Sequence, residues 1–120
     1  MRFNPFVFGK DHQQIPVSIV PMTQTDAEST NLPPAWQTSW TSDYLAGERL
    51  EKYAAKVGDE LIALCAYEML NYSLVVHIVY MEAHPKSNPN LDNGEPKYTG
   101  IGRLMIAYGI KLSIDNGFAG

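Results

Sequence analysis

The sequence has little cysteine, little positive charge and no long apolar run, and each of these features argues against one class of protein. Its single cysteine, Cys65, excludes an internal disulfide, so residence in the cytoplasm is the default expectation. The formal net charge of −4 disfavours a general nucleic-acid binder, which needs a basic surface to displace counterions from phosphate. No stretch approaches the roughly 20 apolar residues that a membrane span requires. The first residues also lack the apolar run of a secretory signal.

The composition that remains is typical of one soluble globular domain. Of the 120 residues, 45% are apolar and 18% are charged, which is enough apolar material for a core. We therefore expect a single domain over residues 1–120, with little stability to spare at this length.

The first third of the sequence predicts little regular structure. Residues 1–14 contain three phenylalanines with the spacing of a ragged strand or an extended arm, namely Phe3, Phe6 and Phe8. Residues 15–22 predict one short strand, interrupted by Pro16 and Pro21, and residues 23–31 predict a polar loop.

A helix is predicted from Pro33–Pro34 to Gly47, because proline suits the first helical turn. Within it, Trp36, Trp40 and Tyr44 recur every four residues and would share one face. Such an aromatic stripe is more often part of a core than the wall of a binding site.

The middle of the sequence predicts an antiparallel meander of three strands. Residues 52–57 and 61–70 flank Gly58-Asp59-Glu60, as the two strands of a β-hairpin do. Asn71-Tyr72-Ser73 predicts a second tight turn. Residues 74–81 follow, and their apolar residues fall on both faces of the strand that they would form. We therefore expect this third strand to be covered on both faces.

A long polar loop over residues 83–96 leads into a predicted amphipathic helix over residues 101–116. Its expected apolar face recurs at helical spacing and consists of Ile101, Leu104, Met105, Tyr108 and Leu112. Asn116-Gly117 is a typical signal for the end of a helix.

The segment from Lys97 to Arg103 carries the clearest chemical signal, because two glycines stand at the start of this helix. The first N–H groups of a helix have no partner within it, and together with the helix dipole they attract an anion. Glycine lets the backbone approach a phosphate closely. Residues 97–111 contain three basic residues and no acidic one, in a chain that is acidic overall.

Two interpretations of this glycine turn stay open on the residues alone: an anion site, or a loop that only turns the chain. Other phosphate motifs fit less well. A P-loop needs Lys-Ser/Thr after its last glycine, whereas Gly102 is followed by Arg103 and Leu104. The dinucleotide fingerprint needs a third glycine where Met105 stands, and it follows its strand more closely.

The order of these features resembles the GNAT superfamily of N-acetyltransferases. A meander, an apolar strand ending in Ala83-His84-Pro85, a loop, and Lys-x-x-Gly-x-Gly at a helix start come in that family's order. The family's pyrophosphate loop is written Arg/Gln-x-x-Gly-x-Gly/Ala, so Gly100 and Gly102 match and Lys97 is a mild departure. The resemblance covers residues 53–120, and the first 48 residues align only loosely.

The resemblance implies an α/β (α+β) fold like that of acyl-CoA N-acyltransferases, with a mixed, mainly antiparallel sheet and a strand–loop–helix unit for acetyl-CoA. It implies that loop amides bind the pyrophosphate and that the preceding strand end pairs with the pantetheine arm and points an amide at the thioester carbonyl. The residues concerned are Lys97, Tyr98, Thr99, Gly100, Ile101, Gly102 and Arg103 in the loop, and Val79, Tyr80 and Met81 in the strand. It also implies that the chain stops at the start of the fifth strand, so that the C-terminal part of the fold is missing.

Two side chains near the end of the third strand are candidates for proton transfer. Glu82 would accept a proton from the acceptor amine, although a solvated charge at a strand end is an equally good interpretation. His84 would relay that proton, although a loop histidine beside Pro85 is the simpler interpretation. If the resemblance holds, Trp36 and Trp40 border the acceptor. The three histidines have no metal-ligand spacing, so no metal is assigned.

The leading hypothesis is an enzyme that transfers acetyl from acetyl-CoA to a small-molecule or peptide amine by direct attack. The alternatives are a module that binds coenzyme A or a partner without turnover, and an inactive fragment. In the family the general acid comes from beyond the fifth strand. A strand edge left open by missing structure would recruit a second copy, so we expect a homodimer. The N-terminal phenylalanines folding over that edge are the alternative.

Overall fold

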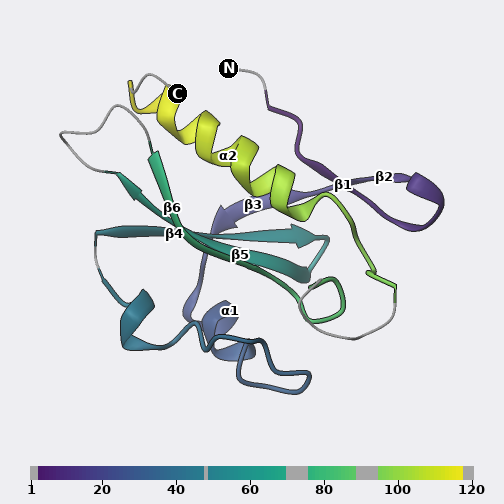
Figure 1. The fold of residues 1–120 in the computed structure, drawn as a ribbon, viewed down its shortest axis with the longest axis horizontal. Coiled ribbons are helices and arrows are strands. Elements are labelled where there is room, and N and C mark those ends of the chain that lie inside the picture. Colours follow the sequence, from purple (N-terminus) through teal and green to yellow (C-terminus); the bar gives the residue numbers. More distant parts are fainter. Residues whose placement is uncertain (1–2, 48, 70–75, 89–94, 118–120) are drawn as a thin grey trace.

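A computed structural model describes residues 3–47, 49–69, 76–88 and 95–117 and shows an α+β fold in which one long helix crosses an antiparallel sheet (Figure 1). In chain order the elements are β1 Phe6–Phe8, the 3-10 turn η1 Lys10–His12, β2 Gln14–Pro16, β3 Ser18–Pro21, α1 Gln24–Ser29, the 3-10 turn η2 Asp43–Leu45, β4 Leu50–Val57, β5 Glu60–Met69, β6 Val76–Ala83 and α2 Ile101–Asp115.

The main sheet has the order β3-β4-β5-β6, and every described pair in it is antiparallel. The predicted hairpin is confirmed: β4 and β5 are joined at Gly58-Asp59, where Gly58 has the positive φ of 59° that glycine tolerates best. The predicted turn at Asn71-Tyr72-Ser73 and the first two residues of the predicted third strand lie outside the described residues.

Two apolar layers cover the two faces of the sheet, and β5 contributes to both. Ala63, Cys65 and Tyr67 face the layer that contains α2, whereas Leu64 and Ala66 face the layer that contains the two tryptophans. β6 also contributes to both layers, because Val76 and Ala83 pack on the α2 side and Val79 and Tyr80 pack on the tryptophan side. The prediction of a strand covered on both faces over residues 74–81 is therefore borne out only in part. β5 is the strand buried on both faces, while β6 lies at the edge of the described sheet and keeps Ile78 and Met81 37% exposed.

The helix predicted from Pro33–Pro34 to Gly47 is wrong. This segment is irregular up to the short turn η2, and Tyr44 is exposed rather than aligned with the tryptophans. Its N–H groups bind acceptors elsewhere in the chain: those of Trp36 and Trp40 donate to Thr30. These contacts compete with the i→i−4 bonds that a helix would need.

Two further differences lie earlier in the chain. The predicted polar loop 23–31 contains α1, which begins with a capping box in which Thr23 and Asp26 each bind the other's backbone N–H. Residues 15–22 form two strands instead of one. β2 pairs with β1 as a separate hairpin, and β3 pairs with β4 in the main sheet.

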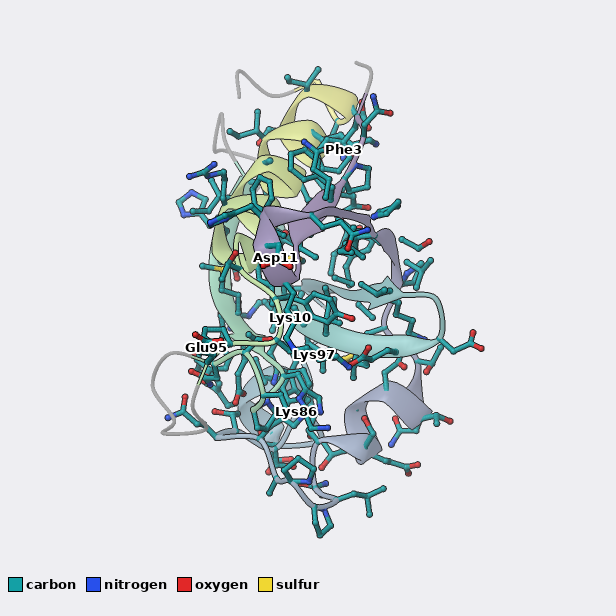
Figure 2. The ribbon with its side chains drawn as sticks, turned by 90° about the vertical axis from the view of Figure 1, so that its right-hand side faces the viewer. Phe3, Lys10, Asp11, Lys86, Glu95 and Lys97 are labelled. Carbon is teal, nitrogen blue, oxygen red and sulfur yellow. The ribbon has the colours of Figure 1, made fainter. Side chains whose placement is uncertain are left out.

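The N-terminal hairpin lies beside α2 and the loop that precedes it. Phe8 and Thr99 exchange two backbone hydrogen bonds, of 2.9 and 2.8 Å. Phe3 packs on Tyr108 of α2 with ring centroids 5.9 Å apart, and Figure 2 shows it beside that helix. The arm is therefore held against α2 and the glycine turn.

The predicted C-terminal helix is confirmed as α2, with Asn116 at its C-cap and Gly117 just after it. Its buried face contains four of the five predicted residues, Ile101, Leu104, Met105 and Leu112, and Tyr108 packs against the same cluster. No helix in the described part of the chain has the length and apolar character needed to cross a membrane.

Candidate functional site

A cavity of about 440 Å³ opens where the end of β6 meets the first turn of α2. Its walls come from both layers of the molecule, because α2 lies on one face of the sheet and the segment around Gln37 lies on the other (Figure 1). The lining residues are Gln37, Ala63, Tyr80, Met81, Glu82, Ala83, Ser87, Asn88, Pro96, Tyr98, Thr99, Gly100, Ile101, Gly102 and Met105.

The glycine turn forms one wall of this cavity, at the N-terminus of α2. Gly100 is the N-cap with a left-handed φ of 85°, and no side chain caps the helix. The N–H groups of Ile101, Gly102 and Arg103 therefore have no partner within the helix. This wall presents backbone donors and the positive end of a fifteen-residue helix dipole.

Not all the amides of the predicted loop are available for a ligand. The N–H of Tyr98 donates to Ser87 Oγ at 2.9 Å, and the N–H of Thr99 donates to the Phe8 carbonyl at 2.8 Å. The donor set of the turn therefore begins at Gly100. These two contacts hold the approach to the turn in place.

Gly102 leaves room in the cavity wall. A Cβ added there would meet only Met81 Cε, at an ordinary 3.9 Å. Because the residue lines the cavity, a larger side chain would project into the space a ligand needs.

The end of β6 supplies the facing wall. Tyr80 and Met81 line the cavity, whereas Val79 packs against the tryptophan layer. The hydroxyl of Tyr80 lies 2.9 Å from that of Thr38, so the strand end is tied to the segment after α1. Of the three strand residues predicted to meet a ligand, two border the cavity.

Glu82 is 5% exposed and lines the cavity, yet both its oxygens have partners. Oε2 accepts the N–H of Gln37 at 2.6 Å, and Oε1 accepts the N–H of Thr38 at 3.3 Å. Oε1 also accepts the indole N–H of Trp40 at 3.2 Å. The carboxylate therefore anchors the segment 37–40 to the end of β6, a role that the sequence did not indicate.

His84 lies two residues further on but is not among the residues that line the cavity. Its Nδ1 accepts the N–H of Lys86 at 3.1 Å, and its ring meets Trp36 at 5.8 Å. Burial and the charge of Lys86 lower the pKa of His84, although Glu60 opposes them. The neutral form is therefore favoured at neutral pH, with the proton on Nε2.

Trp36 and Trp40 lie in the core layer and not in the cavity wall. Trp40 is 2% exposed and stacks at a tilt on Tyr80, with ring centroids 5.6 Å apart. Of the two interpretations of the aromatic stripe, this placement favours the core. Trp40 reaches the site only indirectly, through Glu82 and Tyr80, and the ring of Trp36 meets His84 instead.

The basic residues of the predicted loop lie outside the cavity. Lys97 pairs with Glu60 at 2.8 Å, and Tyr98, which does line the cavity, donates its hydroxyl proton to the same carboxylate at 3.0 Å. Burial alone would raise the pKa of Glu60, but these hydrogen bonds outweigh it and lower that pKa. Arg103 is exposed, and Figure 2 shows Lys86 and Lys97 on the same side of the molecule.

Sequence reasoning missed three polar residues of the cavity wall: Gln37, Ser87 and Asn88. Asn88 donates its side-chain N–H to Gln37 Oε1 at 2.9 Å, across 51 positions of sequence. Neither residue stands in a motif, so no local signal could have found them. Within the described residues, no three His, Cys, Asp or Glu side chains gather as a metal site would require.

No protein-family model, no curated protein and no solved structure matches this chain.

Proposed function

We propose that the chain binds acetyl-CoA in this cavity and transfers its acetyl group to an amine, on a fold like that of acyl-CoA N-acyltransferases. The observation that supports the proposal is the composition of the cavity wall. Backbone donors that have no partner within α2 and the end of β6, the edge strand of the described sheet, border one space of about 440 Å³. That volume lies within the range of ordinary ligand pockets.

The residues present fit such a ligand. The N–H groups from Gly100 to Arg103 would bind the pyrophosphate, and the apolar lining would accept the pantetheine arm. That lining includes Ala63, Met81, Ile101 and Met105. Acetyl-CoA would supply an activated thioester. Glu82 lies beside the proposed reaction centre, where a carboxylate attracts an ammonium ion and can take its proton.

A second candidate is a module that binds coenzyme A without turnover, and one observation favours it. Each oxygen of Glu82 already accepts at least one N–H hydrogen bond, from Gln37, Thr38 or Trp40. A carboxylate occupied in this way is a good anchor and has fewer lone pairs left for a substrate. Turnover of acetyl-CoA with a panel of amines separates the two candidates, because only the enzyme releases free thiol.

Gly102→Leu tests the site itself. We expect this variant to bind acetyl-CoA at least about tenfold more weakly in calorimetry, because the new side chain fills the cavity beside Met81. The fold should persist, since leucine is a good helix former and the position has space. Gly47→Leu, away from the cavity, is the matched control. Unchanged affinity in Gly102→Leu would show that acetyl-CoA does not bind in this cavity.

A further inference from the structure

Gln37 is one of the polar cavity residues for which neither the sequence motif nor the proposed chemistry gives a role. It lies in the irregular segment after α1, and its side chain is exposed at the cavity wall. We propose that the side-chain N–H group of Gln37 donates a hydrogen bond to a neutral carbonyl oxygen on the acyl-pantetheine arm of the bound thioester. The inference rests on the proposed function and adds a specificity-determining residue to it.

The backbone at Gln37 is fixed to the edge strand. Its N–H donates to Glu82 Oε2 at 2.6 Å, and the next N–H, of Thr38, donates to Oε1. The hydroxyl of Thr38 also meets that of Tyr80 at 2.9 Å. An irregular segment is held here at two successive residues, so the side chain of Gln37 starts from a defined position on the cavity wall.

The side-chain amide of Gln37 is oriented as well. Its Oε1 accepts the side-chain N–H of Asn88, which is 6% exposed and lines the same cavity. Because the oxygen is occupied by this contact, the Nε2 group remains to serve a ligand. Within the described residues Nε2 has no hydrogen-bond partner. The backbone N–H and the side-chain oxygen of Gln37 therefore both have partners, and the side-chain NH₂ group is the donor that faces a ligand.

The neighbouring charge selects the kind of acceptor. Glu82 lies in the same wall and binds the backbone of Gln37 itself. A ligand carboxylate next to Gln37 would face this carboxylate across a short distance and be repelled. A neutral carbonyl oxygen accepts the same hydrogen bond without that repulsion. The acyl-pantetheine arm contains such oxygens in its thioester and in its amides. Either kind of carbonyl could accept the hydrogen bond from Gln37, and the experiment below distinguishes them.

Calorimetry with three ligands on the full chain tests the inference and separates the sources. The ligands are acetyl-CoA, coenzyme A, and adenosine 3′,5′-bisphosphate, which lacks the whole arm. Gln37→Met removes the donor at similar size. Gln37→Leu also removes the donor without adding a charge beside Glu82, and denaturant unfolding of both variants guards against a folding defect. Gln24→Met, on the exposed surface of α1, is the matched control.

We expect both Gln37 variants to bind acetyl-CoA about 3- to 10-fold more weakly than wild type, as one lost hydrogen bond implies, and to bind the bisphosphate normally. Loss for acetyl-CoA alone identifies the acetyl carbonyl, and equal loss for coenzyme A identifies an amide of the arm. Unchanged binding of acetyl-CoA, or an equal loss for all three ligands, overturns the role of Gln37. If wild type binds none of the three, the proposed function fails, and this inference with it.

Discussion

Glu82 shows how one residue can connect two layers of a fold. Its oxygens receive the N–H groups of Gln37 and Thr38 and the indole of Trp40, which come from a segment more than forty positions earlier. A buried carboxylate is stable in a protein when hydrogen bonds of this kind replace its hydration. Truncating or neutralising it would leave several buried donors without their partner, so its structural contribution can be measured apart from any chemistry.

Glu82→Gln is therefore expected to lower the free energy of unfolding by about 1–3 kcal/mol, because the new NH₂ group must face an N–H donor. Denaturant unfolding measures this change. In a Trp40→Phe background one donor is gone, so the same substitution should cost less. Equal costs in both backgrounds would show that the indole contact contributes nothing. A fall in turnover of roughly 10²-fold or more, with acetyl-CoA affinity little changed, stays the separate prediction for a proton acceptor.

At the scale of single residues, the sequence indicated the parts of the site that carry a local signal. A helix start has a recognisable pattern, and the two glycines that this pattern singled out, Gly100 and Gly102, both line the cavity. Gln37 and Asn88 meet only through tertiary structure, so nothing in their own surroundings could predict them.

The contact between α2 and β5 depends on a close approach at the middle of the helix. A Cβ added at Gly109 would lie 3.0 Å from Tyr67 Cε1, at the limit of what real contacts show. Tyr67 cannot easily move, because it is fully buried and its hydroxyl donates to the Met105 carbonyl at 2.6 Å. The missing side chain therefore sets the distance between helix and sheet.

Gly109→Val is expected to destabilise the fold by about 1–3 kcal/mol, as overpacking of a core does. Ala107→Val places the same side chain on a less crowded face of the same helix and should cost only about 0.5 kcal/mol, from the lower helix propensity of valine relative to alanine. Thermal and denaturant unfolding both report the difference. Equal effects of the two substitutions would mean that the helix moves away from Tyr67 without cost.

Among the elements, those with a strong local pattern were predicted and the others were not. The hairpin of β4 and β5 has a Gly-Asp turn between apolar runs, and α2 has a regular apolar face between a glycine start and a glycine end. The segment 33–47 has helical aromatic spacing, yet its N–H groups bind Thr30 and Glu82 instead. Hydrogen-bond acceptors from distant parts of the chain determine the conformation of that segment, and an argument from periodicity does not take them into account.

On the whole molecule, exposed apolar side chains gather along the outer face of α2 and the edge strand β6. Ile106, Ile110 and Ile114 recur every four residues and are 44–49% exposed. Ile78 of β6 is 37% exposed and lies near the same helix, because a Cβ added at Gly109 would meet its Cγ1 at 3.9 Å. The N-terminal arm, the alternative cover considered for this edge, instead pairs with Thr99 and packs on Tyr108.

A second copy of the chain is the expected cover for this surface, and a homodimer stays our prediction. Sedimentation should show a dimer at low micromolar concentration, and dilution should lower thermal stability together with the dimer fraction. Ile110→Glu should shift the protein to monomer because it places a charge in the middle of the stripe. Leu32→Glu, at a position 62% exposed on the opposite layer, should leave the dimer intact. A well-folded wild-type monomer at that concentration would contradict the prediction.

The bridge between Phe8 and Thr99 also bears on how the molecule folds. Its two hydrogen bonds join residues from nearly opposite ends of the described chain, and one of them fixes the approach to the glycine turn. Closing so long a loop carries an entropic cost that local contacts such as the β4–β5 hairpin do not have. We therefore expect the hairpin to form early and the cavity to become competent for ligand late, in the last cooperative step. During synthesis, the central strands of the growing polypeptide would therefore be formed and exposed before the cavity could bind a ligand.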